Sequence, residues 1–152
     1  MNIKPSISLI VIILSGCMNN FKNPEIEFIG LNLSDNNSNM TFLSSADFST
    51  RKNSRQTGSY LYCINGEDIL DNSFTPDFSN QNYLVSNIPK DIKLPRDKSS
   101  NKFVYNVELE LSKTIDFRKP IYCRVFTGSF PGALQKSQVF EILPDKIKKI
   151  EF

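Results

Sequence analysis

Cysteine is the residue type with the most distinctive chemistry in this chain. The sequence has three cysteines, Cys17, Cys63 and Cys123, and no histidine. The absence of histidine excludes Ser-His-Asp and Cys-His nucleophilic systems and histidine-ligated zinc. It also removes the commonest general base, and the sequence has no Gly-rich phosphate loop. The thiols and the carboxylates remain as the groups that could do chemistry.

The carboxylates give little sign of catalysis. Glu108 and Glu110 are two residues apart in a strand-like segment and share a face, but their alternation with apolar residues indicates the solvent side of a sheet. Four acidic residues between positions 67 and 77 could surround a cation, but their spacing fits no EF-hand loop. We therefore expect no enzyme activity, no catalytic residue, no cofactor and no metal. A hydrolase that uses carboxylates alone is the least favoured alternative.

Cys17 follows a leader that is typical of exported proteins. Lys4 precedes an apolar run over residues 7–14, and the small residues Ser15 and Gly16 come directly before the cysteine. A positive residue, an apolar run and small residues at a cleavage point predict a signal peptide over residues 1–16. The run is much shorter than the about 20 residues that a membrane-spanning helix needs, so it is a poor permanent anchor.

The residues Leu14-Ser15-Gly16-Cys17 resemble the lipobox of bacterial lipoproteins. The resemblance implies that the Cys17 sulfur receives a diacylglycerol, that the leader is cut before Cys17, and that the new amine is acylated. Three acyl chains would hold the protein on a membrane, because each buried CH₂ contributes about 0.8 kcal/mol. Met18, and not aspartate, follows the cysteine, which by the same resemblance implies the outer membrane of a Gram-negative cell, on its periplasmic or surface face. In a Gram-positive cell the signal would imply the outer face of the plasma membrane.

Cleavage would leave a short lipidated tether over residues 17–24 and one domain over residues 25–152. The seven residues from Met18 to Pro24 span at most about 25 Å, so we expect the domain to lie close to the membrane. The chain has 18 Lys and Arg against 16 Asp and Glu, and cleavage removes only Lys4 from this count. The remainder is nearly neutral, so no nucleic-acid partner is expected.

Cys63 and Cys123 remain after the leader is accounted for. An exported chain meets an oxidising compartment, where two remaining cysteines usually pair. We predict a Cys63–Cys123 disulfide; two buried free thiols are the alternative. A closed loop of about 60 residues would give such a link roughly 4 kcal/mol in the chain-entropy account.

Alternation of apolar and polar residues predicts strands along most of the chain. The clearest is over residues 102–112, where the apolar odd positions from 103 to 111 share one face. Over 121–127, Ile121, Cys123 and Val125 should face inward. An Asn65-Gly66 pair predicts a hairpin-type turn. Further strands are predicted over 25–33 with a bulge near Gly30, and over 40–43, 59–64, 83–88, 136–143 and 147–152.

These segments predict an all-β fold, an antiparallel β-sandwich of about seven strands with one disulfide. Cys63 in an early strand and Cys123 in the penultimate one resemble the order in an immunoglobulin-like domain. That family has a core tryptophan after the first cysteine, but this chain has none, so Phe74 or Phe78 is expected to fill the place. It also has a tyrosine at the position of Ile121. A transthyretin-like sandwich and a small closed barrel are the alternatives.

Four residues near the second cysteine are candidates for contact with another protein. Tyr122, Arg124 and Phe126 alternate with the inward set and should face the other side of the strand, and Phe130 lies at the tip of a predicted hairpin over 128–132. Tyrosine, phenylalanine and arginine are suited to interfaces. Either a second sheet layer or strand covers the first three, or they form a protein-contact surface.

The anchor, the predicted fold and the excluded chemistry together predict a membrane-anchored lipoprotein that binds another protein in the bacterial envelope. A structural or accessory subunit of an envelope or secretion assembly is the alternative. The expected partners are therefore the membrane, through the N-terminal lipid, and a protein. We expect no small-molecule substrate.

Lipidation at Cys17 can be tested directly in cells. When cells are grown with radioactive palmitate, the wild-type chain should carry label and the Cys17→Ala chain should carry none. Incorporation into the Cys17→Ala chain would contradict the assignment.

Overall fold

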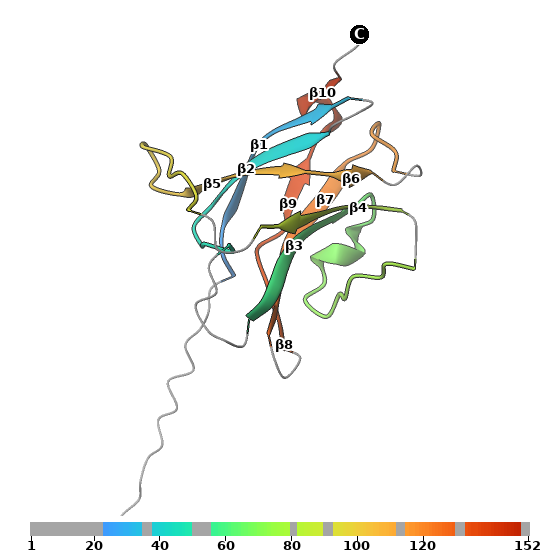
Figure 1. Ribbon diagram of the computed structural model, residues 1–152. Coiled ribbons are helices and arrows are strands. Elements are labelled where there is room, and N and C mark those ends of the chain that lie inside the picture. Colours follow the sequence, from blue (N-terminus) through green and yellow to red (C-terminus); the bar gives the residue numbers. More distant parts are fainter. Residues whose placement is uncertain are drawn as a thin grey trace, which may run out of the picture.

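The computed structural model describes residues 23–34, 38–49, 56–79, 82–89, 93–111, 115–129 and 133–149 (Figure 1). The leader with Cys17, and Phe130 at the predicted hairpin tip, lie outside these ranges. In the part that is described, no helix is long and apolar enough to span a membrane.

The described chain forms two β-sheets. The first, with four strands, has the order β10 (Ile147–Lys149), β1 (Ile26–Leu33), β2 (Asn39–Ser44) and β5 (Phe103–Glu108). The second, with six strands, has the order β6 (Glu110–Leu111), β4 (Tyr83–Ile88), β3 (Gln56–Ile64), β7 (Ile121–Ser129) and β8 (Ala133–Lys136), and β9 (Phe140–Ile142) also pairs with β7. Two short 3₁₀ helices, η1 (Glu67–Leu70) and η2 (Pro144–Lys146), lie between strands.

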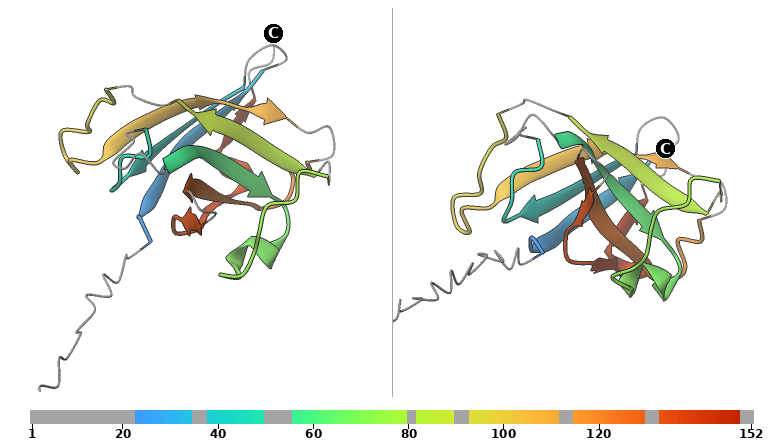
Figure 2. Two further views of the ribbon diagram at one scale, coloured as in Figure 1. Left: turned by 60° about the horizontal axis from the view of Figure 1, so that its bottom comes forward. Right: turned by 90° about the horizontal axis from the view of Figure 1, so that it is seen from below.

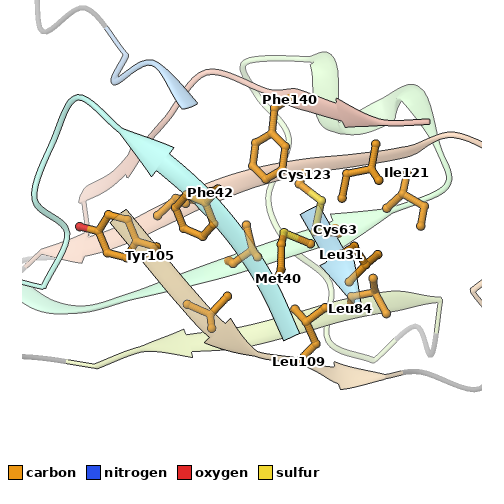
Figure 3. Packing of buried hydrophobic residues seen from close by; sticks show 14 of the residues in the cluster. Leu31, Met40, Phe42, Cys63, Leu84, Tyr105, Leu109, Ile121, Cys123 and Phe140 are labelled. Atoms are coloured by element: carbon orange, nitrogen blue, oxygen red, sulfur yellow. A yellow bond between two sulfur atoms is a disulfide. The ribbon is translucent and has the colours of Figure 1, made fainter. Parts of the chain in front are cut away.

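The predicted β-sandwich is confirmed. The main hydrophobic cluster takes residues from both sheets, including Met40 and Phe42 of β2 and Leu61 and Val125 of the second sheet, all with no exposed area (Figures 2 and 3). Both sheets therefore direct apolar side chains into the core between them and alternate these with outward-facing residues. Short strands at the edges raise the count above the predicted seven.

The strand predicted over 102–112 is divided between the two sheets. β5 pairs with β2 in the first sheet, whereas β6 pairs with β4 in the second. Leu109 lies between them, is buried, and donates its backbone N–H to the Ser38 carbonyl at 2.8 Å. The inward side chains keep their alternation through this crossing, because Tyr105, Val107 and Leu109 all face one core. The sequence period was therefore read correctly, but it could not show that the strand changes sheets.

Strand order on both sheets of the described chain resembles the immunoglobulin arrangement, without a strand D. In the first sheet, β1, β2 and β5 correspond to strands A, B and E. In the second sheet, β9, β7, β3 and β4 correspond to strands G, F, C and C′. β10 adds a parallel edge strand next to β1. Lys148 on this strand is exposed, and an exposed lysine discourages further strand pairing at an edge.

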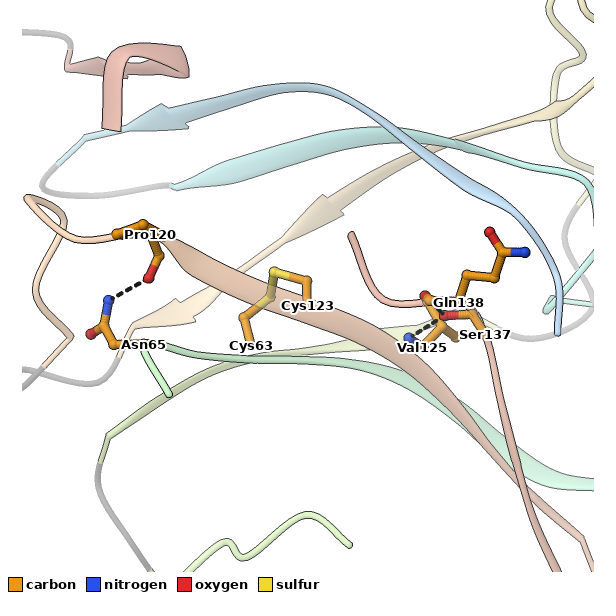
Figure 4. Close-up of a disulfide and its surroundings, with 7 residues drawn as sticks. All are labelled: Cys63, Asn65, Pro120, Cys123, Val125, Ser137 and Gln138. Atoms are coloured by element: carbon orange, nitrogen blue, oxygen red, sulfur yellow. Dashed lines mark hydrogen bonds between the residues drawn. A yellow bond between two sulfur atoms is a disulfide. The ribbon is translucent and has the colours of Figure 1, made fainter. Parts of the chain in front are cut away.

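The predicted disulfide joins Cys63 to Cys123, but it joins neighbouring strands of one sheet (Figure 4). The two residues lie directly opposite each other on β3 and β7, with Cα atoms 4.1 Å apart. An immunoglobulin disulfide instead links strand B to strand F across the core. The core face of β2 here carries Met40 and Phe42, so apolar packing takes the place of an inter-sheet disulfide at this level.

The hairpin turn predicted at Asn65-Gly66 is wrong. The Asn65 side chain accepts the Asp116 backbone N–H at 2.9 Å and donates to the Asp116 and Pro120 carbonyls at 3.0 and 3.2 Å. These bonds fasten the end of β3 to the start of β7, and one of them is drawn in Figure 4. The chain then enters η1 and does not return at once as β4.

Two other local predictions have different outcomes. The bulge near Gly30 is confirmed, since the β1–β2 register shifts between Phe28 and Gly30. The strand predicted over 136–143 is interrupted at buried Ser137, whose Oγ accepts the Val125 N–H at 2.9 Å. β8 therefore ends at Lys136, its only residue within the predicted range, and the rest of the segment forms β9; both strands pair with β7.

Removal of the disulfide should test its contribution to stability. The Cys63→Ala, Cys123→Ala chain should lose about 2–5 kcal/mol of unfolding free energy, because its unfolded state is no longer closed into a long loop. Urea denaturation would measure the loss, and the m-value should rise as the unfolded chain expands. A loss below about 1 kcal/mol would contradict this account.

Candidate protein-contact surface

The outer face of the second sheet is rich in aromatic residues. On β7, Ile121, Cys123 and Val125 face the core with no exposed area, as predicted. The alternate residues Tyr122, Arg124 and Phe126 therefore lie on the outer face, where Tyr60 and Tyr62 of β3 join them.

A segment that we call the strap, residues 67–79, lies over this outer face. It begins with η1, which contacts β7, and continues as turns without a strand (Figures 1 and 2). Ile69 of the strap is fully buried in a second hydrophobic cluster with Tyr62 and Phe126. Phe74 packs against the same two rings, with centroids 6.0 and 6.3 Å away. The strap is thus a covering layer for the sheet.

The strap decides between the two interpretations of the outer residues of β7. Arg124 is 3% exposed and Phe126 is fully buried, so neither offers a contact surface. The cover is a 3₁₀ helix with turns, and not the second sheet layer or strand that the sequence suggested. Tyr122 alone of these three is partly accessible. Burial and the nearby carboxylates of Glu141 and Glu67 raise the pKa of Tyr122.

Two cations from neighbouring strands hold the strap through its backbone. Lys136 Nζ donates to the carbonyls of Asn72 and Phe74, each at 2.6 Å. Arg124 Nη1 donates to the Asp71 carbonyl at 3.3 Å, and Nη2 is 3.5 Å from Asn72 Oδ1. Charge-assisted hydrogen bonds therefore fix the middle of the strap, residues 71–74, to β7 and β8.

Arg124 is poorly satisfied in this position. Its Nε is buried without a hydrogen-bond partner, and among the described residues no carboxylate lies within salt-bridge distance of its guanidinium. Burial of the guanidinium lowers the pKa of Arg124. A buried charge without a counter-ion costs desolvation energy, so Arg124 fastens the strap less efficiently than Lys136 does.

Hydrogen bonds within the strap give it a defined shape. Asp71 Oδ1 accepts from the Ser73 backbone and hydroxyl at 2.7 and 2.8 Å, and these bonds lower the pKa of Asp71. Asp77 Oδ1 accepts in the same way from Ser79, at 2.9 and 2.6 Å. The Tyr62 hydroxyl donates to the Asp77 carbonyl at 3.1 Å and joins the second of these turns to β3.

An accessible aromatic residue lies at the end of the strap. Phe78 is 50% exposed, yet its ring makes edge contacts with Tyr60, Tyr62 and Tyr83, with centroids 5.4–5.6 Å away. Tyr60 and Tyr83 are half-buried, so Tyr60, Phe78 and Tyr83 form a patch that we call the aromatic patch. Phe74 and Phe78 both lie on the outer face, which corrects the expectation that one of them replaces the core tryptophan.

Sequence reasoning missed the aromatic patch because nothing local indicates that residue 78 returns to β3 and β4. The signal that was available is the apolar set Ile69, Leu70, Phe74 and Phe78 within a turn-rich segment. Leu70 is also exposed, at 49%. An apolar set of this kind in an irregular segment indicates a loop that packs on a surface.

The carboxylates do not converge in the part of the chain that the structure covers. No group of three or more Asp, Glu or Cys residues there could hold a metal ion. Glu108 and Glu110 are both exposed and stand on strands of different sheets, β5 and β6.

Comparison with protein-family models, curated proteins and solved structures finds no match to this chain.

Substitutions at the two cations should separate their effects on stability. Arg124→Met should leave the free energy of unfolding unchanged or raise it, because a flexible apolar side chain replaces an uncompensated buried charge. Lys136→Met should lower it by about 1–3 kcal/mol, because two charge-assisted hydrogen bonds to carbonyls are lost. Urea denaturation would measure both values. A larger loss for Arg124→Met than for Lys136→Met would contradict this interpretation.

Proposed function

We propose that this chain is a lipoprotein, anchored through Cys17, whose β-sandwich binds another protein of the bacterial envelope through the aromatic patch. The observation that carries the proposal is the position of Phe78, half exposed and packed edge-on against three tyrosine rings. The role is one of binding and not of catalysis.

The aromatic patch has the properties of an interface centre. Tyrosine and phenylalanine are enriched at interface cores and bury a large area with few rotatable bonds. The ring contacts of Phe78 order it before any partner arrives, which reduces the entropy lost on binding. Among the described residues the other exposed large apolar residues are Ile29, Leu70 and Leu143, and none of them is aromatic.

The start of the domain leaves the aromatic patch accessible. Pro24 accepts the Gln138 backbone N–H at 2.9 Å, next to the connection between β8 and β9. The aromatic patch lies over β3 and β4, on the other side of β7 in the same sheet. A tether that ends at Pro24 would therefore hold the domain at the membrane without covering Phe78.

Substitution of Phe78 provides the test of this function. In cells that express the full chain, mild crosslinking followed by purification should recover a partner with the wild-type chain. Phe78→Ala should lose most of it, because removal of a central interface residue costs about 2 kcal/mol or more, roughly 30-fold in affinity. Leu143→Ala is the matched control, since it removes a similarly exposed apolar side chain elsewhere.

The same experiment separates the two functional hypotheses. A partner recovered only under some growth conditions, and dependent on Phe78, supports the binding role. A constant stoichiometric assembly supports the accessory subunit. Equal recovery with Phe78→Ala and Leu143→Ala would contradict the aromatic patch as the contact surface.

A further inference from the structure

The charged residues of the strap are all of one sign. Glu67, Asp68, Asp71 and Asp77 are exposed, and the strap has no lysine or arginine. Two of these carboxylates are fixed by the Asx-type turns at Ser73 and Ser79. The strap therefore presents a constant negative surface around Leu70 and Phe78.

The two cations that contact the strap offset only part of this charge, since Lys136 attracts the Asp71 carboxylate. Arg124 is buried beneath the strap, and Lys136 directs its ammonium group at the strap carbonyls. Glu141, which is exposed on β9 next to Tyr122, adds a further negative charge on the same face. The solvent-facing surface of the strap consequently has a net negative charge.

The positive charge of the domain lies elsewhere. The segment 93–102 has Lys93, Arg96, Lys98 and Lys102 against one acidic residue, Asp97. It leads into Phe103, which pairs with Ser44, whose other neighbour is Ile26 at the start of β1. The segment 93–102 thus has a net positive charge, although Lys102 pairs with Glu27 of β1 at 3.0 Å, whereas the strap has only acidic charges.

We propose that the partner of the aromatic patch presents lysine or arginine side chains around an apolar residue. This inference rests on the proposed function and adds the chemical class of the partner. An apolar residue of the partner would contact Phe78 while its basic neighbours approach the strap carboxylates. Complementary charge of this kind accelerates association and excludes wrong partners. Anionic lipid headgroups and nucleic acids would be repelled by the same surface.

Selection from a random peptide library would test this inference. The full chain, made with its own leader and purified in a non-ionic detergent, serves as the target for phage that display linear peptides. Phage that also bind the Phe78→Ala chain are removed. The surviving peptides should be enriched in lysine and arginine around an apolar residue, relative to the unselected library.

A charge-neutral strap tests whether the carboxylates are the cause. The substitutions Glu67→Gln, Asp68→Asn, Asp71→Asn and Asp77→Asn keep the acceptor oxygens. They should slow association of a selected peptide about tenfold or more, because its electrostatic steering is lost. The matched control, which removes the same charge from exposed positions elsewhere, should bind as the wild type does; it combines Glu25→Gln, Glu108→Gln, Glu110→Gln and Asp145→Asn.

Salt gives a second measurement that needs no substitution. Between about 0.1 and about 1 M NaCl the Debye length falls from about 10 to about 3 Å, so association with the wild type should slow towards that of the neutral strap. If the fourfold variant does not fold, Glu67→Gln with Asp68→Asn replaces it and should show a smaller loss of the same kind.

The outcomes distinguish this inference from the proposed function. Phe78-dependent peptides that are neutral or acidic would overturn the basic partner and leave the binding role intact. An equal loss in the neutral strap and in the matched control would also overturn it. No Phe78-dependent peptide at all would overturn both proposals. Self-association of the wild type that the neutral strap abolishes would make a second copy the occupant, and would overturn a separate partner.

Discussion

The pairing of β3 with β7 buries two different sets of side chains, and both functional proposals depend on it. On one face Cys63 lies opposite Cys123 within the sandwich core. On the other face Tyr62 lies opposite Arg124, beneath the strap. The central strands of the second sheet are therefore covered on both sides, which antiparallel sheets do not require. The cover on the outer side is irregular chain, so its exposed surface is set by turns and not by a strand period.

Apolar contacts between the two sheets take the place of a disulfide that would link them. The disulfide fixes β3 to β7 and does not cross the core, so contacts between apolar residues of the two sheets hold the sandwich together. Phe42 and Tyr105 stack with centroids 4.8 Å apart, and Phe140 of the second sheet lies 6.1 Å from Phe42. The Tyr105 hydroxyl accepts the Phe48 N–H at 2.6 Å, which also ties the loop after β2 to the core. Burial raises the pKa of Tyr105.

The strap unites structural and functional roles in one segment. Its inner side chains, Ile69 and Phe74, complete the outer cluster, while Phe78 remains half exposed. Its carbonyls receive the hydrogen bonds of Arg124 and Lys136, and its four acidic residues are exposed to solvent. A surface that must expose apolar side chains is best held rigid, because a mobile one would lose entropy on binding. The strap fits this requirement through its short turns and its bonds to β3, β7 and β8.

The sequence by itself determined which residues face the core and which cysteines pair. A two-residue period requires only the geometry of an extended chain, so the inward sets of residues 103–109 and 121–125 could be read directly. Only the tertiary structure decided that the strand over 102–112 changes sheets at Leu109, that Arg124 and Phe126 are covered, and that Phe78 lies against Tyr60 and Tyr83. These outcomes depend on contacts between distant positions, such as Asn65 with Asp116 or Lys136 with Asn72, which no local pattern of residue types records.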